Sequence, residues 1–319
     1  MTLLSVQDLS VAFGPIRVLE DVSFDIAEGE VLGVVGESGS GKSMTALAVM
    51  GLLPMGGRVA AGRIAFEGND ITRLPEREMQ HLRGARMAMI FQEPMASLNP
   101  VLTVGEQIAE VLRRHRGLDR RAAHREAISL LKLVEIAAAE RRVDEYPHQL
   151  SGGMRQRAMI AIALACRPRL LIADEPTTAL DATVQAGILD LLRGLRRELG
   201  MAVLLITHDL GVVSDICERV VVMYAGRVAE TGEAGTIFAR PAHPYTRALL
   251  AAIPRLEGPI GALPAIAGVV PAPADFPAGC RFAPRCPYAI PACEAAPPAL
   301  RPVPGGTTAA CIRAEEIIA

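Results

Sequence analysis

The sequence predicts an α/β domain built around a mostly parallel sheet, followed by an irregular C-terminal extension rich in proline and cysteine. Between residue 3 and about residue 233, short apolar runs alternate with amphipathic helical runs, as in α/β domains. Beyond about residue 238 the composition changes, and most of the chain's 23 prolines lie in residues 241–304. Proline interrupts helices and central strands, so we expect this extension to be irregular apart from a short helix over residues 245–252.

Length and composition allow one large domain and a smaller one. The chain has 319 residues, of which 50% are hydrophobic and 3% aromatic, so its core must be built mainly from aliphatic side chains. The N-terminus resembles no signal peptide, and no run reaches the roughly 18–20 apolar residues that span a bilayer. We therefore expect a soluble protein that reaches a membrane only through partners. The net charge of −2 argues against a nucleic-acid-binding surface over the whole protein.

The predicted strands are short apolar runs, which suit strands buried on both faces. They cover residues 31–35, 86–91, 170–173, 203–206 and 220–223. Between residues 103 and 140 the pattern becomes helical instead. Apolar side chains recur there at helical spacing in two runs: Ile108, Val111 and Leu112, then Ile128, Leu131 and Val134. We interpret this segment as an all-helical insert within the α/β domain.

Residues 36–43 match the pattern G-x-x-x-x-G-K-[ST] of a phosphate-binding loop, between a strand and a helix-compatible run. They are Gly36, Glu37, Ser38, Gly39, Ser40, Gly41, Lys42 and Ser43. Glycines let the backbone curl so that N–H groups face phosphate oxygens, and the following helix adds its positive end. Lys42 would contact the β- and γ-phosphates, and the Ser43 hydroxyl would bind Mg²⁺. The pattern predicts an ATP site rather than a glycine-rich turn with a chance lysine.

Polar side chains at two later strand ends support this site. Asp174 and Glu175 directly follow an apolar strand, and His208 follows the next one. Asp174 can hold Mg²⁺ beside the phosphates, and Glu175 can polarise the water that attacks the γ-phosphate. His208 is more ambiguous, since a lone histidine is often structural. At a parallel strand end it could contact the γ-phosphate and align the water with Glu175.

Residues 150–157, Leu-Ser-Gly-Gly-Met-Arg-Gln-Arg, resemble the signature sequence of the ABC transporter ATPases. The resemblance implies a P-loop NTPase with a RecA-like core, an antiparallel β subdomain and an all-helical subdomain. It also implies a head-to-tail dimer, in which each ATP is held by one chain's phosphate loop and the other chain's signature. Ser151, Gly152 and Gly153 would then form a second anion-binding helix start.

Further residues match the remaining family elements. Gln92 resembles the glutamine that reaches Mg²⁺ and signals to the membrane subunits. Residues 179–181, Ala-Leu-Asp, resemble the D-loop, with Asp181 at the nucleotide. Phe13 resembles the aromatic residue that stacks on adenine, although the family often has tyrosine there and an ordinary core phenylalanine is the alternative.

Flanking sequences resemble the peptide/nickel import branch of the family. They are residues 91–100, 146–149 and 177–185, with residues 243–246 opening a tail like that of dipeptide and oligopeptide importers. The resemblance implies an ATPase domain over residues 1–238, with its helical subdomain at about 96–160, and an importer-type extension over 239–319. It implies a peripheral position on the cytoplasmic face of the membrane and three kinds of partner: a second, non-identical ATPase subunit, two transmembrane permeases and an extracytoplasmic binding protein. It implies no nucleic-acid partner. Peptides are favoured over nickel as cargo.

Four cysteines lie in the extension, separated by five, six and seventeen residues: Cys280, Cys286, Cys293 and Cys311. This spacing matches neither a zinc ribbon nor a ferredoxin run. Four thiolates could bind one [4Fe–4S] cluster or Zn²⁺, and the resemblance implies such a quartet, some members of the branch binding a [4Fe–4S] cluster. Reduced thiols packing a small tail are the alternative. We favour a structural metal, with the cluster ahead of zinc, because a proline-rich coil without a core needs a tie.

Two other functional classes remain open. The helical insert carries a basic cluster, Arg113, Arg114, Arg116, Arg120, Arg121 and Arg125. It is usually a solvated helix face, but it would also suit a soluble ABC ATPase of DNA repair or translation. The other alternative is a binding module that has lost catalysis. The presence of Lys42, Asp174, Glu175 and His208 argues against that module.

Overall fold

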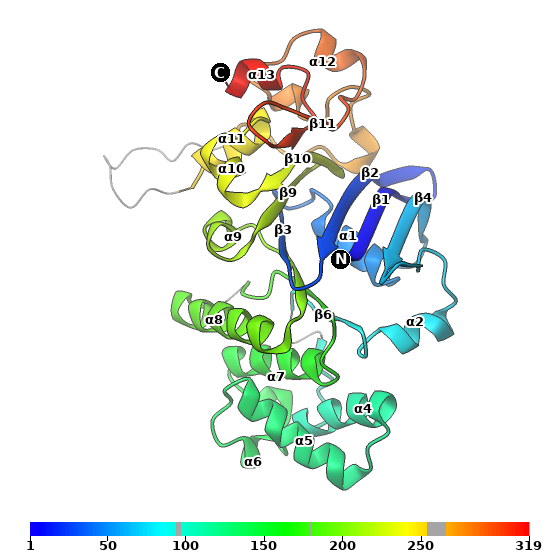
Figure 1. Ribbon diagram of the computed structural model, residues 1–319, viewed down its shortest axis with the longest axis vertical. Helices are drawn as coiled ribbons and strands as arrows, with labels where there is room; N and C mark the ends of the chain where they lie inside the picture. Colours follow the sequence, from blue (N-terminus) through cyan, green and yellow to red (C-terminus); the bar gives the residue numbers. More distant parts are fainter. Residues whose placement is uncertain (94–96, 179, 254–265, 319) are drawn as a thin grey trace. The chain divides into compact units, whose positions relative to one another are not determined.

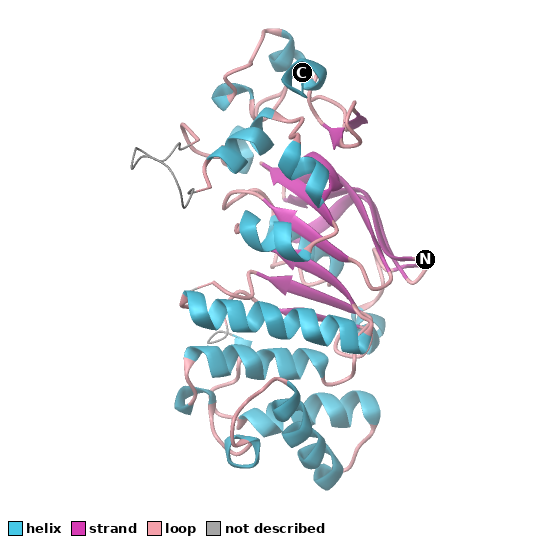
Figure 2. Cartoon of the chain, turned by 60° about the vertical axis from the view of Figure 1, so that its left-hand side comes forward, coloured by secondary structure: helices cyan, strands magenta, loops and turns pink. Residues whose placement is uncertain are grey.

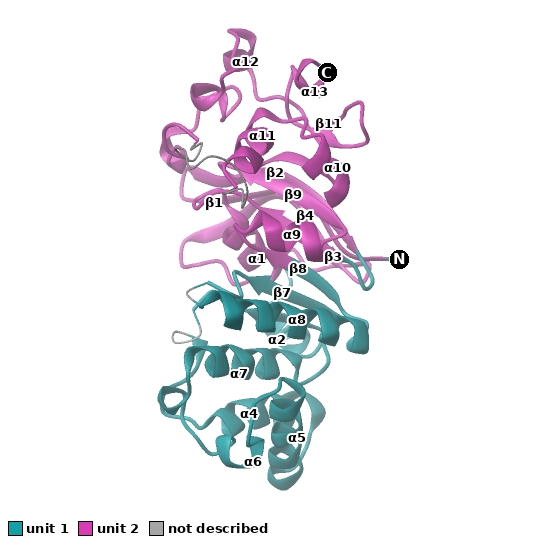
Figure 3. Cartoon of the chain, turned by 90° about the vertical axis from the view of Figure 1, so that its left-hand side faces the viewer, with its two compact units in different colours: residues 1, 27–30, 73–204 teal, residues 2–26, 31–72, 205–319 magenta. Residues whose placement is uncertain are grey.

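The computed structural model describes residues 1–93, 97–178, 180–253 and 266–318 (Figure 1). Its chain divides into two compact units, which we describe separately (Figure 3). The first unit comprises residues 1, 27–30 and 73–204, and the second comprises residues 2–26, 31–72 and 205–319. Strand β8 (Ala202–Ile206) passes from the first unit into the second.

The first unit contains the predicted helical insert. Its helices are α4 (Val104–Arg116), α5 (Arg120–Leu133), α6 (Ala139–Arg142) and α7 (Gly152–Leu164), with a 3₁₀ turn at Pro147–Gln149. Thr103 and Asp119 start α4 and α5, because their side chains accept hydrogen bonds from Glu106 N (3.2 Å) and Ala122 N (2.8 Å). Ile108 and Leu131 are fully buried, as the helical spacing predicted.

A parallel strand pair completes the first unit. β6 (Met87–Ile90) pairs with β7 (Leu170–Asp174) in parallel, Met87 opposite Leu170, and every residue of both strands is buried. Burial on both faces explains why these strands read as continuous apolar runs. Helix α2 (Glu76–Leu82) precedes β6, and α8 (Ala182–Leu199) follows β7. Figure 2 shows α7 and α8 side by side, in agreement with the close approach of Gly153 to Val184.

The second unit begins with the antiparallel subdomain. Its strand order is β2-β1-β4-β5, from β1 (Thr2–Phe13), β2 (Ile16–Ala27), β4 (Gly57–Phe66) and β5 (Asn69–Asp70). β1 pairs antiparallel with β4, and the register shifts on either side of Ser10. This confirms the antiparallel β subdomain that the family resemblance implied.

The strand before the phosphate loop is the most enclosed of the second unit. β3 (Val31–Val35) is buried throughout and pairs in parallel with β9 (Arg219–Tyr224), which pairs antiparallel with β10 (Arg227–Glu233). Helix α9 (Leu210–Ile216) lies so close to β3 that a Cβ at Gly33 would be 2.9 Å from Val213 Cγ1. α1 (Lys42–Val49) follows the loop after β3, and α10 (Ala234–Ala239) follows β10.

The extension has more regular structure than the prolines predicted. The expected helix is α11 (Pro244–Ala251), but 3₁₀ turns (Pro273–Asp275 and Ala283–Arg285), α12 (Ala292–Ala295), β11 (Arg301–Pro302), β12 (Thr308–Ala309) and α13 (Ala314–Ile318) also form. β12 pairs with β10, and β11 pairs with β12. A small core of Ala242, Val303, Ala309 and Ala314 lies beneath them. The prediction of an otherwise irregular tail was wrong for these short elements. β12 forms because β10 offers a sheet edge to which it adds.

Within the described residues, we find no helix with the length and apolar character that crossing a membrane requires.

Candidate functional site

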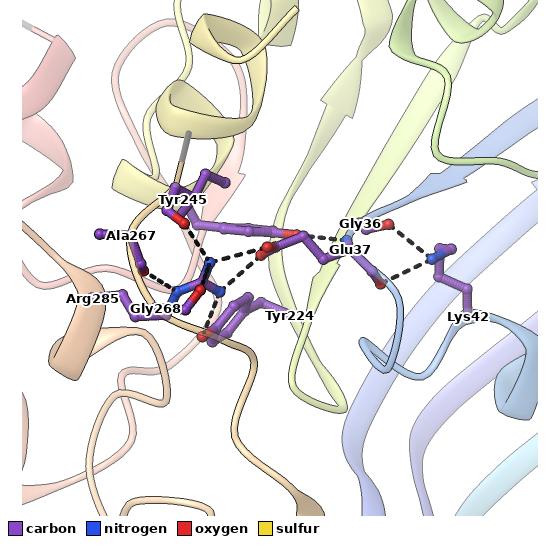
Figure 4. A network of polar contacts seen from close by, with 9 residues as sticks. Gly36, Glu37, Lys42, Tyr224, Tyr245, Ala267, Gly268 and Arg285 are labelled. Carbon is purple, nitrogen blue, oxygen red and sulfur yellow. Dashed lines mark hydrogen bonds and ion pairs between the residues drawn. The ribbon is translucent and has the colours of Figure 1, made fainter. Parts of the chain in front are cut away.

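In the second unit, two backbone carbonyls of the phosphate loop accept hydrogen bonds from the lysine of the same loop. Lys42 is 5% exposed, and its Nζ donates to Gly36 O (2.8 Å) and Glu37 O (3.0 Å) (Figure 4). Gly36 has φ of 150°, and a Cβ there would lie 2.2 Å from Met223 O, so only glycine fits. The strand–loop–helix arrangement that the motif predicted is therefore present, with the lysine ammonium held at the loop.

The start of α1 has no side-chain cap. Its cap residue, Gly41, has φ of 103° and offers no side chain to the first turn. The N–H groups of a first helical turn lack partners within the helix and carry the positive end of the helix dipole. Ser43, the predicted Mg²⁺ ligand, is the second residue of α1.

Two further predicted residues belong to the same unit. Phe13 ends β1 opposite Gly57 of β4, where a Cβ at residue 57 would lie 2.8 Å from the Phe13 ring. The glycine therefore leaves room for the aromatic ring. His208 is exposed two residues after the end of β8. The next residue, Asp209, starts α9, because its side chain accepts from Gly211 N (2.9 Å).

The first unit contains both the predicted base, Glu175, and Gln92, which is hydrogen-bonded to it. β7 delivers Asp174 at its end, 5% exposed, and Glu175 turns away with φ of 47°. The Glu175 carboxylate oxygen Oε2 accepts from Gln92 Nε2 (3.0 Å) and from Thr178 Oγ1 (2.8 Å). A positive φ at a non-glycine residue is uncommon. Thr178 was missed, although its place three residues after the base in a tight turn was a usable signal.

The signature residues form the start of α7, as predicted. Ser151 precedes the helix, and its hydroxyl accepts from Met154 N (3.3 Å). Gly152 and Gly153 are its first residues, and a Cβ at Gly153 would lie 2.7 Å from Val184 Cγ1 of α8. Asp181 starts α8 by accepting from Val184 N (2.9 Å). Ala179 of the predicted D-loop lies outside the described residues.

Comparison with known proteins adds the family. A family model described as ABC transporter matches residues 19–178. The chain belongs to the ABC transporter family. A second model, described as the C-terminal region of oligopeptide/dipeptide transporters, matches residues 229–293. The chain is therefore an ATP-binding subunit of the ABC type.

Relatives and solved structures cover most of this ABC subunit. It is 51% identical to the dipeptide transport ATP-binding protein DppD of Escherichia coli over 315 residues, 98% of this chain and 96% of DppD. It is 50% identical to the oligopeptide transport ATP-binding protein AppD of Bacillus subtilis over 320 residues, 99% and 98% of the two chains. The ATP-binding cassette MJ0796, solved as a dimer in a post-hydrolysis state with ADP and Pi, matches with a TM-score of 0.65 and 30% identity, over 73% of this chain and 99% of MJ0796.

The four extension cysteines of this ABC subunit line a single pocket. Its remaining wall is largely apolar, with Phe282, Ala283 and Ile312 among its residues. Burial raises the pKa of the Cys280 and Cys286 thiols and raises the pKa of Cys311 to about 11, so these groups are protonated at neutral pH. Within the described residues, no three His, Cys, Asp or Glu side chains are already arranged to hold a metal ion. Four thiols are a donor set that suits a soft metal ion. In the described residues, however, they are not positioned to coordinate one together.

Proposed function

We propose that this chain binds and hydrolyses ATP to power the import of dipeptides or oligopeptides across the cytoplasmic membrane. The observation that carries the proposal is the half-identity to dipeptide and oligopeptide transport ATP-binding proteins over nearly the whole chain. Two contacts support the proposal further. Lys42 is held by the carbonyl of Gly36 in the phosphate loop, and Gln92 donates a hydrogen bond to the proposed base, Glu175.

The proposed roles follow the chemistry of each group. Lys42 and the N–H groups at the start of α1 bind the β- and γ-phosphates, and Phe13 stacks on the adenine. Ser43, Asp174 and Gln92 hold Mg²⁺, which neutralises phosphate charge in the transition state. Glu175 takes a proton from the attacking water, and His208 orients the γ-phosphate. Gln92 keeps the Glu175 carboxylate in place between turnovers.

The proposed partners complete the second half of each site. Ser151, Gly152, Gly153 and Asp181 present a helix start to the nucleotide of a second ATPase subunit, for which we propose a different chain. Two permeases and an extracytoplasmic binding protein would complete the importer, with this chain at the cytoplasmic face.

Ion pairs of Arg113 with Glu106 and of Arg116 with Glu126 support the interpretation of the basic cluster as a solvated helix face.

Substitution of the proposed base tests the catalytic assignment. Glu175→Gln removes the proton acceptor but keeps the side-chain shape, so ATP should bind normally while steady-state hydrolysis by the assembled transporter falls at least about a hundredfold. ATP should also trap the associated ATPase pair in size-exclusion chromatography. Turnover near the wild-type rate would remove Glu175 from the mechanism.

Cargo is tested by uptake. In cells that lack their own dipeptide and nickel importers, this chain with its operon partners should restore uptake of a labelled dipeptide but not of nickel. Restoration of nickel uptake alone would assign the chain to the nickel importers of the same branch. DNA-stimulated hydrolysis without permeases would favour the soluble ABC ATPases instead.

We also propose that Cys280, Cys286, Cys293 and Cys311 hold a [4Fe–4S] cluster, or Zn²⁺, as a structural tie. A shared pocket with apolar walls supports this. Because burial raises the pKa of Cys280, Cys286 and Cys311, metal loading releases protons from these thiols and strengthens as pH rises. Protein purified anaerobically should be brown and contain iron, and Cys286→Ser should lose both the colour and the iron. An ordered extension free of iron and zinc would show that the thiols merely pack the tail.

A further inference from the structure

Two arginines between the first pair of extension cysteines contact the phosphate loop or the turn beside it. The segment is Cys280-Arg281-Phe282-Ala283-Pro284-Arg285-Cys286, which we call the arginine segment. Figure 4 shows Arg285 reaching Glu37, the second residue of the phosphate loop. Every residue in this network belongs to the second unit.

The Arg285 side chain is only 5% exposed, and each of its guanidinium nitrogens donates hydrogen bonds. Nη1 and Nη2 donate to the two carboxylate oxygens of Glu37 at 2.9 and 3.0 Å, a bidentate pair. Nη1 also donates to Tyr224 Oη (3.2 Å), and Nε donates to Ala267 O (2.8 Å). The Glu37 carboxylate raises the pKa of Arg285 above its ordinary value. A planar guanidinium in such a frame fixes the carboxylate in position as well as in charge.

Glu37 is thereby held through each of its polar groups. Its carboxylate binds Arg285, its N–H donates to Tyr245 Oη (2.8 Å), and its carbonyl accepts from Lys42 Nζ (3.0 Å). Tyr245 is fully buried on α11. The Glu37 N–H is therefore committed to the extension, so this residue anchors the loop rather than adding an N–H group toward phosphate.

A second set of contacts reaches the same loop from Arg281. Its guanidinium donates to Ala225 O and pairs with Glu20. The next residue of that turn, Gly226, donates its N–H to Ser40 O of the phosphate loop (2.9 Å). Between the two arginines, Phe282 is 2% exposed and its ring packs on Tyr224 and Tyr245, with centroids 5.2 and 5.4 Å away.

We propose that the arginine segment positions the phosphate loop, and that Arg285 sets the affinity for ATP by fixing Glu37 and thereby the carbonyl that holds Lys42. The inference rests on the proposed function only in that the loop binds ATP. Arg285 does not touch the nucleotide in this proposal, so it is a positioning residue. Cys280 and Cys286 bound the segment, so the cysteine pocket and the ATP site share one covalent element.

The test compares two arginines that make the same kind of pair. Arg285→Gln removes the contact with Glu37, whereas Arg301→Gln removes the Arg301–Glu315 pair, which is also bidentate and within the extension but has no contact with the loop. Binding of a fluorescent ATP analogue to the purified full chain should weaken about tenfold in Arg285→Gln and less than twofold in Arg301→Gln. Arg285→Lys should recover part of the affinity, since it keeps the charge without the fork.

The loop side of the pair gives an independent measurement. Glu37→Gln should weaken binding to the same degree, and the double variant Glu37→Gln/Arg285→Gln should bind no worse than either single variant. In the assembled transporter, Arg285→Gln should raise KM more than it lowers kcat. If Arg285→Gln does not fold, Glu37→Gln removes the same ion pair from the loop side and leaves the sequence of the extension unchanged.

Three outcomes would overturn the inference: wild-type affinity in folded Arg285→Gln or, where that variant does not fold, in Glu37→Gln; an equal loss in Arg301→Gln; or additive losses in the double variant. Lys42→Ala separates this from the proposed function. Normal ATP binding by Lys42→Ala would refute the loop as the ATP site, whereas lost binding there with wild-type affinity in Arg285→Gln, or in Glu37→Gln where Arg285→Gln does not fold, would refute only the positioning role.

Discussion

Gly153 shows how the packing of two helices can require glycine at a single position. It lies in the first turn of α7, and a Cβ there would approach Val184 Cγ1 to 2.7 Å. Valine is branched at Cβ and stiff at χ1, so it cannot swing aside cheaply. The glycine therefore lets α7 and α8 approach closely.

We expect Gly153→Ala to lower the free energy of unfolding by about 1–3 kcal/mol through overpacking against Val184. Gly152→Ala is the matched control, because its Cβ would lie 3.7 Å from Leu180 Cδ2, an ordinary contact. Urea unfolding of the two variants and the parent chain measures the difference. Equal midpoints for Gly152→Ala and Gly153→Ala would show that α7 and α8 adjust freely.

At the scale of elements, α11 begins on a buried histidine. His243 accepts from Tyr245 N through Nδ1 (3.0 Å), and its other ring nitrogen bonds the Ala310 backbone. Burial lowers the pKa of His243 from 6.5 to about 4. Only the neutral ring can accept at Nδ1, so protonation would remove the cap of the helix that carries Tyr245 to the phosphate loop.

This histidine should make the fold acid-sensitive. Its folded pKa lies below its unfolded value, so the unfolded chain binds the proton first, and stability present above pH 6.5 is lost as pH falls toward about 4. The loss amounts to about 3 kcal/mol. Nearby Glu230, whose pKa burial raises, opposes this trend, so only a comparison isolates the histidine. His243→Asn keeps a capping oxygen, and its unfolding free energy should vary less between pH 6.5 and 4; an unchanged slope would contradict the assignment.

Elements with local periodicity were predictable, and long-range partners were not. The strand predicted at residues 170–173 is β7, and the predicted helical residues Ile108 and Leu112 are buried on one face of α4. Such elements are predictable because their buried residues recur at regular spacing along the chain. β11 and β12 have two residues each, too few for any pattern. The pair of Arg285 with Glu37 joins residues 248 apart, so nothing near either residue indicates it.

At the scale of the whole molecule, the two candidate anion sites are unlike. The start of α1 has no side-chain cap, whereas Ser151 caps α7 through Met154 N. In the proposed dimer, the start of α1 binds the nucleotide of this chain. The start of α7 adds a contact to the nucleotide that the partner subunit already holds.

Two substitutions should separate these sites. Lys42→Ala removes the charge at the loop and should lower ATP affinity in the isolated chain by at least about tenfold. Ser151→Arg should leave that affinity unchanged, because α7 would contact only the partner's nucleotide, yet abolish the ATP-dependent association seen with Glu175→Gln and reduce hydrolysis by the complex. Ser151→Ala controls for loss of the cap, costing about 1 kcal/mol of stability. If Ser151→Arg weakens ATP binding by the isolated chain as much as Lys42→Ala does, the two sites act on one nucleotide within a single subunit, and the shared-site dimer is the wrong description.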